Sequence, residues 1–445
     1  MKLTVIGAGY IGLITAACFA DMGNEVICVD PDEKKIDDLD HYRLPVYEPG
    51  LEDLIRRNCM GKRLFFSTNL AKAVQASLIC YLTLSPPPQE GEVPDIAAFL
   101  HVAREIGRHL NDYKVIVNKS AVPVGTVARL RQTIAEELAA RGGEHDFDVV
   151  SDPEFIKQGT AIDDFMKPDR VVIGCDNDRV AELMKELYAP FVRTNRPIII
   201  MDVASAELIK YAANAFLATK ISFINELANI CAATGADINA IRQGLGSDSR
   251  IGNLFLFPGL GYGGLRFSQG IQELIYTAKL HGYQPRLLEA TEAINRNQRL
   301  LFIEMIRSYF RNQLQGRVLG VWGLAFKPWT DDIREAPSLT VVQALLQEGA
   351  RIKAYDPQAV KAAQNYWGGS QTNLTYAADM YEAAEKADAL IINTDWTMFR
   401  TPDFERLKSR LAVPVIFDGR NLYNPARLAQ LGFEYFYIGC KKASP

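Results

Sequence analysis

The segment that most constrains the fold lies at the N-terminus, where an apolar run leads directly into a glycine motif. Residues Lys2 to Ile6 predict a short buried strand, and Gly7-Ala8-Gly9-Tyr10-Ile11-Gly12 follows at once. An amphipathic helix from Leu13 to Met22 and a second strand from Glu25 to Val29 come next, and Asp30 ends that strand. This order predicts a βαβ unit with parallel strands.

Each glycine of the motif has its own physical task. Gly7 permits a tight turn, Gly9 lets the backbone approach a pyrophosphate, and Gly12 allows the helix to pack closely on the strand. The residues at the start of the helix, Tyr10 and Ile11 among them, present unpaired N–H groups to phosphates. The turn is therefore a candidate phosphate site.

Asp30 lies 18 residues after Gly12, where its carboxylate can accept hydrogen bonds from the adenosine ribose hydroxyls. Because it would repel a 2′-phosphate, the pattern favours NAD over NADP. Lys35 is a further candidate cofactor contact. A purely structural turn is the alternative for an isolated GxGxxG, but the strand, helix and acidic residue in register favour a dinucleotide site.

Alternating strands and helices continue beyond this unit. Leu78 to Thr83 and Lys114 to Lys119 predict buried strands, and Ile96 to Leu110 predicts a helix. The pattern is typical of a doubly wound parallel sheet, whose ligands gather at the carboxyl ends of the strands. Thr83 and Ser120 lie there and are candidate cofactor contacts, although both are equally compatible with simple helix caps.

Length and composition narrow the class of protein. A chain of 445 residues is too long for one hydrophobic core and predicts two or three domains. With 48% hydrophobic and 23% charged residues it is typical of a soluble globular protein. A formal net charge of -4 gives no electrostatic case for nucleic acid or an anionic membrane as partner.

The cysteines and the apolar segments point to a cytoplasmic protein. The seven cysteines are widely spread and have no metal-ligand spacing, so we expect reduced thiols and no metal site. The apolar start runs into a glycine motif, which is not a cleavage site, so no signal peptide is expected. No uncharged apolar run reaches the roughly 20 residues that a membrane helix needs.

Five short motifs along the chain point to one family. They are Val46-Tyr47-Glu48-Pro49-Gly50-Leu51, Lys119-Ser120-Ala121-Val122-Pro123-Val124-Gly125-Thr126, Ser151-Asp152-Pro153-Glu154-Phe155, Gly159-Thr160-Ala161 and Lys167-Pro168-Asp169-Arg170. In this order they resemble the YEPGL, K-S-T-V-P-x-G-T, S-N-P-E-F, G-[ST]-A and K-P-D-R segments of the nucleotide-sugar 6-dehydrogenases, the UDP-glucose/GDP-mannose dehydrogenase family. The resemblance covers nearly the whole chain.

The resemblance implies an α/β fold with two Rossmann-like doubly wound domains joined by a long central helix. It divides the chain into an NAD-binding domain at 1–196, a central helical dimerisation domain at 197–300 and a UDP-sugar-binding domain at 301–445. The sequence independently predicts one long helix from Ala204 to Ile230, because apolar residues recur at three- and four-residue spacing without Pro or Gly. By resemblance, this helix forms a homodimer interface.

Glu207, Lys210 and Asn214 share one face of that helix. In the family, residues at the positions of Lys210 and Asn214 stabilise negative charge on the reacting oxygen, a task that suits preorganised ammonium and carboxamide donors. The pattern alone would leave Lys210 as a solvated surface residue. Glu154 is the candidate proton acceptor.

The resemblance also implies the substrate contacts. Arg250 is similar to a family arginine that reaches the substrate across the dimer. The glycines of the segment 259–264 allow backbone N–H groups to close on a sugar or phosphate. The remaining candidates for substrate binding are Phe155, Phe255, Gly261, Gly263 and Phe326.

The C-terminal third predicts a second Rossmann-like half. Strands at Arg317 to Trp322 and Arg351 to Tyr355 alternate with a helix, but the turn at 323–327 lacks a full GxGxxG, so a second dinucleotide is not expected. The family binds the uridine diphosphate of its substrate here. Lys327, also a candidate cofactor contact, and Arg420 suit a diphosphate, with structural salt bridges as the alternative.

The chain departs from the family at its chemical centre. The family loop reads GxGFGGSCFxKD, whose Cys traps an aldehyde and yields a thioester during the second of two hydride transfers to NAD. Here Arg266 replaces the Cys, Gln269 the Lys and Gly270 the Asp, and Gln158 stands where many members carry a second glutamate. Arginine has no lone pair to offer as a nucleophile. Arg266 suits a carboxylate ligand in the former active site.

Three hypotheses remain open at this point. The first is an NAD-dependent enzyme that oxidises a UDP-sugar hydroxyl in one two-electron step or in a reversible oxidation, with Lys210 steadying the alkoxide. The second is a full UDP-glucose 6-dehydrogenase that hydrates the aldehyde without a covalent intermediate. The third is an inactive protein that binds a nucleotide sugar or NAD.

Overall fold

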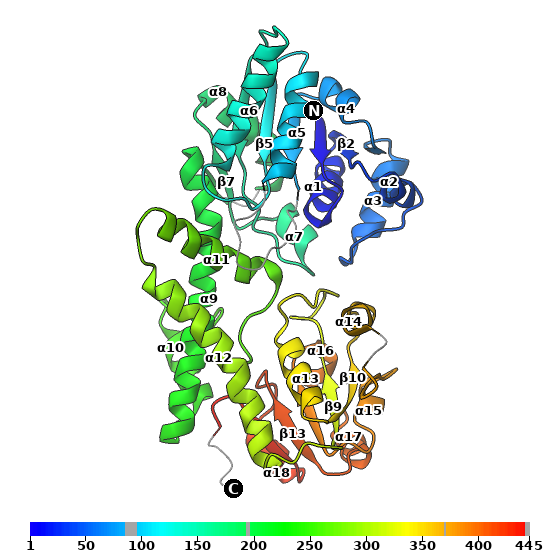
Figure 1. The fold of residues 1–445 in the computed structure, drawn as a ribbon, viewed down its shortest axis with the longest axis vertical. Helices are drawn as coiled ribbons and strands as arrows, with labels where there is room; N and C mark the ends of the chain where they lie inside the picture. The colour runs from blue at the N-terminus through cyan, green and yellow to red at the C-terminus, as the bar shows by residue number, and fades with distance from the viewer. Residues whose placement is uncertain (85–95, 193–195, 369–370, 441–445) are drawn as a thin grey trace. The chain divides into compact units, whose positions relative to one another are not determined.

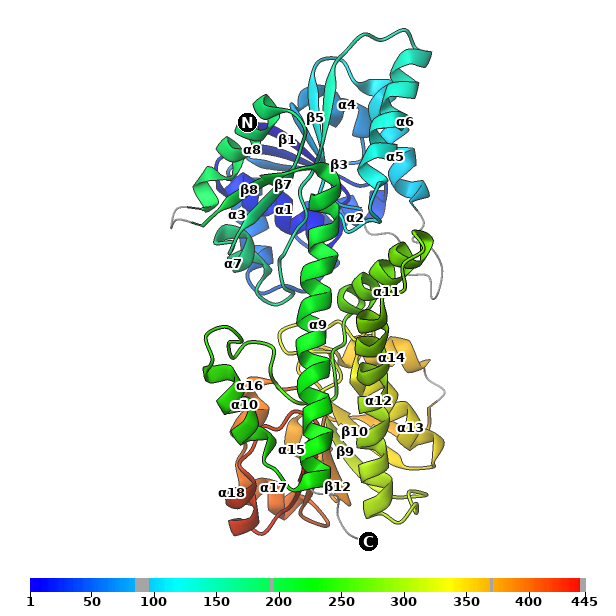
Figure 2. The ribbon, with the colours of Figure 1, turned by 90° about the vertical axis from the view of Figure 1, so that its left-hand side faces the viewer.

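The structure, a computed structural model, describes residues 1–84, 96–192, 196–368 and 371–440. These residues form two compact units, Met1–Ala212 and Ala213–Pro445. The boundary between the units falls within one helix, α9 (Val203–Thr234), which is 32 residues long. Figure 2 shows α9 as one unbroken helix, and the predicted segment from Ala204 to Ile230 lies within it.

The first unit is built on one sheet, whose described strands have the order β3-β2-β1-β4-β5-β6-β7-β8 (Figure 1). Neighbouring strands are parallel except for β6 and β7, which pair antiparallel. The strands are β1 (Lys2–Ile6), β2 (Glu25–Val29), β3 (Leu64–Ser67), β4 (Ile79–Leu82), β5 (Lys114–Asn118), β6 (Phe147–Ser151), β7 (Val171–Gly174) and β8 (Ile198–Met201).

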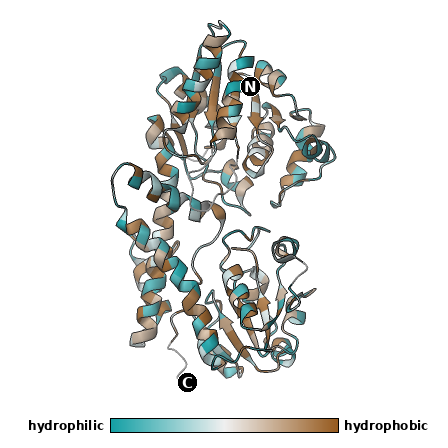
Figure 3. Ribbon diagram, in the orientation of Figure 1, coloured by the Kyte–Doolittle hydropathy of each residue, from teal (hydrophilic) through white to brown (hydrophobic). Residues whose placement is uncertain are grey.

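Helices cover both faces of this sheet. They are α1 (Tyr10–Asp21), α2 (Glu33–Asp40), α3 (Leu51–Met60), α4 (Leu70–Ala76), α5 (Ala97–His109), α6 (Thr126–Ala140), α7 (Ala161–Met166) and α8 (Asp178–Tyr188). Alternate residues of β4 enter different cores: Tyr81 packs with α1, α3, α7 and α8, whereas Cys80 packs with α4, α5 and α6. Because both faces are covered, the strands are mostly apolar, as Figure 3 shows.

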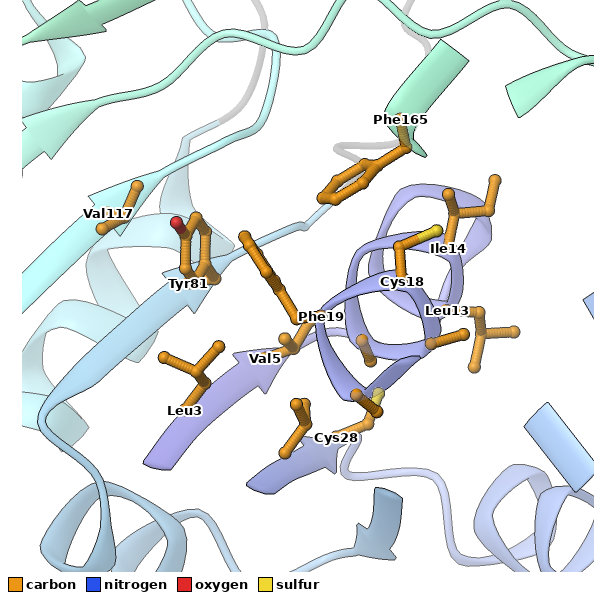
Figure 4. Packing of buried hydrophobic residues seen from close by; sticks show 14 of the residues in the cluster. Leu3, Val5, Leu13, Ile14, Cys18, Phe19, Cys28, Tyr81, Val117 and Phe165 are labelled. Carbon is orange, nitrogen blue, oxygen red and sulfur yellow. The ribbon is translucent and has the colours of Figure 1, made fainter. Parts of the chain in front are cut away.

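The core between the sheet and α1 is filled by aromatic rings. Phe19 of α1 lies with its ring centroid 5.1 Å from that of Tyr81 and 5.2 Å from that of Phe165. Figure 4 shows these three rings beside Leu3 and Val5 of β1. This packing holds α1 on the strand that precedes the glycine turn, and so fixes the geometry of that turn.

The second unit contains helices after α9 and then a parallel sheet. Its strand order among the described residues is β11-β10-β9-β12-β13-β14. The longer helices are α10 (Ile238–Ser247), α11 (Leu265–Leu280), α12 (Arg286–Tyr309), α13 (Pro337–Gln347) and α14 (Val360–Trp367). The strands are β9 (Val318–Trp322), β10 (Arg351–Tyr355), β11 (Leu374–Tyr376), β12 (Ala389–Ile392), β13 (Val415–Asp418) and β14 (Glu434–Tyr437).

The predicted fold class is confirmed: two parallel-sheet α/β units are joined through a long helix. The predicted strands are in place, with ends shifted by at most one residue. The first helix differs more, because α1 begins at Tyr10 and not at Leu13. The last three residues of the glycine motif are therefore the first turn of the helix. The three-domain division at 196 and 300 stays a prediction.

Candidate active site

The glycine turn after β1 has the geometry of a dinucleotide site. Gly7 has φ +106°, which favours glycine, and a Cβ on Gly12 would lie 1.7 Å from the Gly7 carbonyl oxygen. A Cβ on Gly9 would meet nothing within 4 Å. Packing within the chain therefore requires glycine at positions 7 and 12. The open space at position 9 is compatible with the close approach of a pyrophosphate that the motif predicts.

Asp30 lies at the end of β2, next to this turn, and is only 6% exposed. Its Oδ2 accepts hydrogen bonds from the Ala8 N–H and from Lys35 Nζ, both at 2.9 Å, and its Oδ1 accepts from Asp32 N at 3.2 Å. The structure thus brings the predicted cofactor residue Lys35 to Asp30. A cavity of about 280 Å³ opens beside them, lined by Asp32, Lys34, Lys35, Asp38, Arg43, Leu44 and Pro45.

Thr83 and Ser120 lie at adjacent carboxyl ends of the sheet, because β4 pairs with both β1 and β5. The Thr83 hydroxyl lies 2.9 Å from the carbonyl oxygens of Ile6 and Gly7, and the Ser120 hydroxyl donates to Leu82 O at 3.2 Å. These side chains brace neighbouring strand ends, and neither is the N-cap of α5 or α6, the helices that follow them among the described residues. Contact with a cofactor stays a prediction for both.

Glu48 is a residue of this region that sequence reasoning did not single out. It is 5% exposed and accepts a hydrogen bond from the Tyr10 hydroxyl at 2.5 Å. It also accepts from the backbone N–H groups of Gly159 and Ala161, at 2.6 and 2.7 Å. One carboxylate therefore ties the start of α1 to the start of α7. Glu48 belongs to the Tyr47-Glu48-Pro49-Gly50-Leu51 motif, but only the structure shows which groups its carboxylate binds.

Lys210 and Glu154, two predicted catalytic residues, form a buried ion pair in the first unit. Lys210 Nζ lies 2.5 Å from Glu154 Oε1, and the two side chains are 6% and 3% exposed. Glu154 Oε2 accepts a further hydrogen bond from Ile156 N at 2.9 Å. The expectation from pattern alone, a solvated lysine on a helix surface, is wrong. Lys210 is buried because α9 packs against the loop that follows β6.

The other predicted residues near this pair are only partly buried. Asn214 follows Lys210 by four residues on α9, one helical turn along the same face. Phe155, next to Glu154, lies under the guanidinium of Arg170, whose Cζ is 3.9 Å from the ring centroid. Phe155 also lines a cavity of about 240 Å³ that reaches Lys119, Asp152 and Tyr188.

The glycine loop belongs to the second unit, and its glycines have packing reasons. A Cβ on Gly261 would lie 2.2 Å from Asn295 Oδ1, and one on Gly263 would lie 2.5 Å from the Glu335 carbonyl oxygen. A Cβ on Gly264 would lie 2.8 Å from the ring of Phe326. The retained glycines are therefore explained by close packing of the loop on its own unit.

The N–H groups of the same loop are largely occupied. Four of them donate within the second unit: Gly259 to Asn225 Oδ1, Leu260 to Gly419 O, Tyr262 to Asn295 Oδ1 and Gly264 to Arg334 O. We expected these groups to close on a sugar or phosphate. Four of the groups are therefore already bonded within the unit; the N–H groups of Gly261 and Gly263 are not among these four, and their contact with a substrate stays a prediction.

The replaced family positions lie at the start of α11. This helix begins at Leu265, so Arg266, Gln269 and Gly270 all fall within its first two turns. Gly270 is buried and Gln269 is half-buried. The side chain of Arg266 lies outside the described residues, so its predicted catalytic and substrate-binding role stays a prediction from the sequence.

Arg250 and Phe255 lie on the segment between α10 and the glycine loop. The Arg250 side chain is 87% exposed, and its guanidinium binds both carboxylate oxygens of Asp248, with Nη2 2.6 Å from Oδ2. Phe255 has φ +64°, which is unusual for a bulky residue. The exposed Arg250 side chain is therefore accessible to a partner subunit, and its role in a partner's site stays a prediction.

Arg420 and Phe326 meet at the carboxyl edge of the second sheet. Arg420 Nε donates to Asn393 O at 2.6 Å, and its Nη2 donates to Phe326 O at 3.1 Å. Lys327 Nζ lies 5.7 Å from the centroid of the Phe326 ring. Arg420 therefore holds the turn after β9, and Lys327 is carried on that turn.

Asp356 is held by hydrogen bonds within the second unit. It ends β10 as Asp30 ends β2, but it accepts five hydrogen bonds. Oδ2 accepts from Leu324 N, Ala325 N and Trp396 Nε1, and Oδ1 accepts from Gln358 N and Ala359 N. With both oxygens occupied by the protein, the carboxylate has little capacity left for a ribose; that the second unit binds no dinucleotide stays a prediction.

The seven cysteines are all free, and none has a lowered pKa. Burial is the leading cause of a raised pKa at every one of them: Cys18, Cys28, Cys59, Cys80, Cys175, Cys231 and Cys440. Burial raises the pKa of Cys59 to about 11 and that of Cys80 to about 12. A nucleophilic thiolate requires the opposite environment.

Within the described ranges, no group of three or more His, Cys, Asp or Glu side chains is arranged to hold a metal ion. Within the same ranges, the chain has no helix that combines the length and the apolar character of a membrane span.

Comparison with known proteins places the chain among nucleotide-sugar dehydrogenases. Residues 1–192 match the NAD binding domain of the UDP-glucose/GDP-mannose dehydrogenase family, residues 204–297 its central domain and residues 320–425 its UDP binding domain. NAD is thus the cofactor of the first unit, whose glycine turn and Asp30 fit it. The C-terminal match supports a UDP-sugar as ligand of the second unit.

Relatives match over almost the full length. The chain is 45% identical over 445 residues to a UDP-glucose 6-dehydrogenase of Pseudomonas aeruginosa, covering 100% of this chain and 98% of the relative. It is 44% identical to UDP-glucose 6-dehydrogenase TuaD of Bacillus subtilis, covering 98% and 93%. A solved UDP-glucose dehydrogenase from Pyrobaculum islandicum is 32% identical with a TM-score of 0.89, covering 99% and 98%. The chain belongs to the UDP-glucose/GDP-mannose dehydrogenase family.

Proposed function

We propose that the chain is an NAD-dependent oxidoreductase that oxidises a hydroxyl group of a UDP-sugar in a single two-electron step, without a thioester. The observation that carries this proposal is the buried pair of Lys210 and Glu154, 2.5 Å apart. A substrate hydroxyl bound next to this pair would have a cation for its developing negative charge and a carboxylate for its proton. Bound NAD supplies the hydride acceptor.

Glu154, Lys210 and Asn214 have different roles in this step. Glu154 accepts the hydroxyl proton, and the Lys210 ammonium stabilises the alkoxide from which the hydride leaves. The sugar carbon is oxidised to a carbonyl, and the proton passes from Glu154 to water. The resemblance to the family implies that Asn214, one turn after Lys210 on α9, adds a carboxamide donor to the same oxygen.

The absence of a suitable thiol supports a single step. Family members use a Cys at the position of Arg266 to form the covalent intermediate, and the pKa of every cysteine of this chain is raised by burial. A thiol that stays protonated is a poor nucleophile. A carbonyl product, or a reversible oxidation at the same carbon, requires no such group.

The relatives named UDP-glucose 6-dehydrogenase favour one competing function, the full oxidation of UDP-glucose to UDP-glucuronate through a hydrated aldehyde. Counting NADH against sugar consumed, with product identification by mass spectrometry and NMR, decides between them. One NADH per sugar supports the single step, whereas two per sugar and a uronate product contradict it. Binding of NAD and UDP-sugar with no change in either molecule contradicts both and leaves a binding protein.

We also propose that the chain forms a homodimer through α9. Phe216, Phe223 and Ile230 follow each other at seven-residue spacing on this helix, and they are 67%, 48% and 52% exposed. An apolar stripe of this kind on a solvent-facing helix is typical of a protein interface. A dimer would give the exposed Arg250 a partner subunit to reach.

A further inference from the structure

Helix α6 has no side-chain cap of its own, and the same is true of α1, α3, α5 and α7. Helices α2, α4 and α8 each begin with a side chain that caps its own helix, namely Asp32, Asn69 and Asn177. The N-cap residue of α6 is Gly125, which has φ +92° and no side chain to offer. The first N–H groups of α6 therefore need an acceptor from elsewhere in the chain.

Glu207 of α9 supplies that acceptor. Its Oε2 accepts from Gly125 N at 2.7 Å and its Oε1 accepts from Val127 N at 2.9 Å. Glu207 is 5% exposed, so water does not readily substitute for it. Each carboxylate oxygen serves a different N–H group, and its negative charge faces the positive end of the α6 dipole.

The capped segment lies beside the predicted cofactor site. The loop from Lys119 to Gly125 leaves β5, and β5 lies next to β4 and one strand from β1, which leads into the glycine turn. Ser120 on this loop is bonded to the end of β4. Ligands of such sheets bind at these carboxyl ends, so movement of the loop would disturb NAD.

The same turn of α9 carries the candidate chemical pair. Lys210 follows Glu207 by three residues and shares its helix face, so the two side chains leave α9 in similar directions. Glu207 holds the loop after β5, while Lys210 holds Glu154 on the loop after β6, and β5 and β6 are neighbours.

We propose that Glu207 is a positioning residue that fixes the cofactor loop 119–125 relative to Lys210 by capping α6 from α9. The proposal depends on NAD binding by the first unit and not on which oxidation the chain performs. The matched variants are Glu207→Gln and Asp202→Asn. Gln keeps the size of Glu207 but has one acceptor, and its NH₂ group would face a backbone N–H. Asp202 is exposed and accepts from Ser205 N at 2.8 Å, which Asn reproduces.

NAD and UDP affinities of both variants are measured by calorimetry, beside thermal unfolding. For Glu207→Gln we expect the Kd for NAD to rise about fivefold or more, since one buried donor loses its acceptor, while the Kd for UDP stays unchanged. For Asp202→Asn we expect the same Kd for NAD and the same Kd for UDP as for the unaltered protein. An unchanged Kd for NAD in Glu207→Gln overturns the proposal, as does an equal loss of NAD and UDP binding, which would indicate general misfolding.

Hydrogen exchange on the unaltered protein tests the same contact without any variant. The N–H groups of Gly125 and Val127 should exchange as slowly as those inside α6, because both donate to a buried carboxylate. In Glu207→Gln these two should exchange at least about tenfold faster, with Leu130 and Ile134 unchanged. Fast exchange of Gly125 and Val127 in the unaltered protein contradicts the proposal even if the variant fails to fold.

Discussion

Lys210 Nζ lies 2.5 Å from Glu154 Oε1, and both side chains are almost completely buried. A buried ion pair is costly to break, because removing one partner leaves the other charge without compensation in a medium of low dielectric constant. The pair therefore links stability with the proposed chemistry: the charges that would assist proton and hydride removal also hold α9 to the loop after β6.

Lys210→Met should abolish oxidation and destabilise the protein by about 3–5 kcal/mol, because it strands the Glu154 carboxylate. The double variant Lys210→Met with Glu154→Gln should regain much of this stability and none of the activity. Unfolding in urea and NADH formation measure the two effects. The control is Lys185→Met, whose partner Glu182 is 70% exposed and which should cost at most about 1 kcal/mol. If Lys210→Met and Lys185→Met lowered the free energy of unfolding by the same amount, the buried pair would have no special role in stability.

Substitutions at Gly9 and at Gly12 should separate the effect on NAD binding from the effect on folding. Gly9→Ala should fold normally, because its Cβ meets nothing within 4 Å, but it should weaken NAD binding at least about tenfold if the pyrophosphate approaches there. Gly12→Ala should lose both stability and NAD binding, since its Cβ would lie 1.7 Å from a carbonyl oxygen. Calorimetry with NAD and thermal unfolding compare the two. Full NAD affinity in Gly9→Ala would contradict the assignment of the pyrophosphate to this turn.

Thiol reagents should leave the activity intact. Because burial raises the pKa of every cysteine, the thiolate fraction at pH 8 is smaller than for a free cysteine, and alkylation by iodoacetamide should be slow. Labelling of the half-buried Cys59 should accelerate as the pH rises toward its pKa of about 11. Mass spectrometry follows the labelling while NADH formation follows the activity. Rapid alkylation near neutral pH together with loss of activity would reveal a catalytic thiol and overturn the single-step proposal.

Arg266→Cys by itself should not produce uronate. The thiol would return, but Gln269 and Gly270 would still stand in place of the family Lys and Asp, so proton transfer and water activation would remain unsupported. The triple variant with Gln269→Lys and Gly270→Asp is the comparison. Products are identified by mass spectrometry, and full uronate synthesis by Arg266→Cys alone would contradict this interpretation.

Phe223→Lys should dissociate the proposed dimer, because it puts a charge into the apolar stripe of α9. Tyr366→Lys is the matched control, since Tyr366 is 60% exposed on α14, away from α9 in the sequence. Sedimentation velocity should give a dimer for the control and a monomer for Phe223→Lys. A monomeric parent protein, or a Phe223→Lys variant that stays dimeric, would exclude α9 as the interface.

Local patterns identified the long helix and six of the fourteen strands in the described residues. Strands buried on both faces are continuous apolar runs, and α9 keeps helical spacing over its whole length, so period and composition identify them. Helix α1 begins three residues before its predicted start, because Tyr10, Ile11 and Gly12 belong both to the glycine motif and to the helix. Sequence spacing does not show where a turn becomes the first turn of a helix.

The sequence by itself determined the family and the NAD turn and predicts the loss of the catalytic Cys, because these depend on residue identity at fixed local spacing. Only the tertiary structure decided that Lys210 is buried against Glu154, and that Glu207 caps a helix which begins 81 residues earlier in the chain. It also showed that the glycines of the loop at 259–264 are required by packing. Whether a side chain is buried or paired depends on which segments, far apart in the sequence, pack against each other. Local sequence patterns do not specify this packing directly.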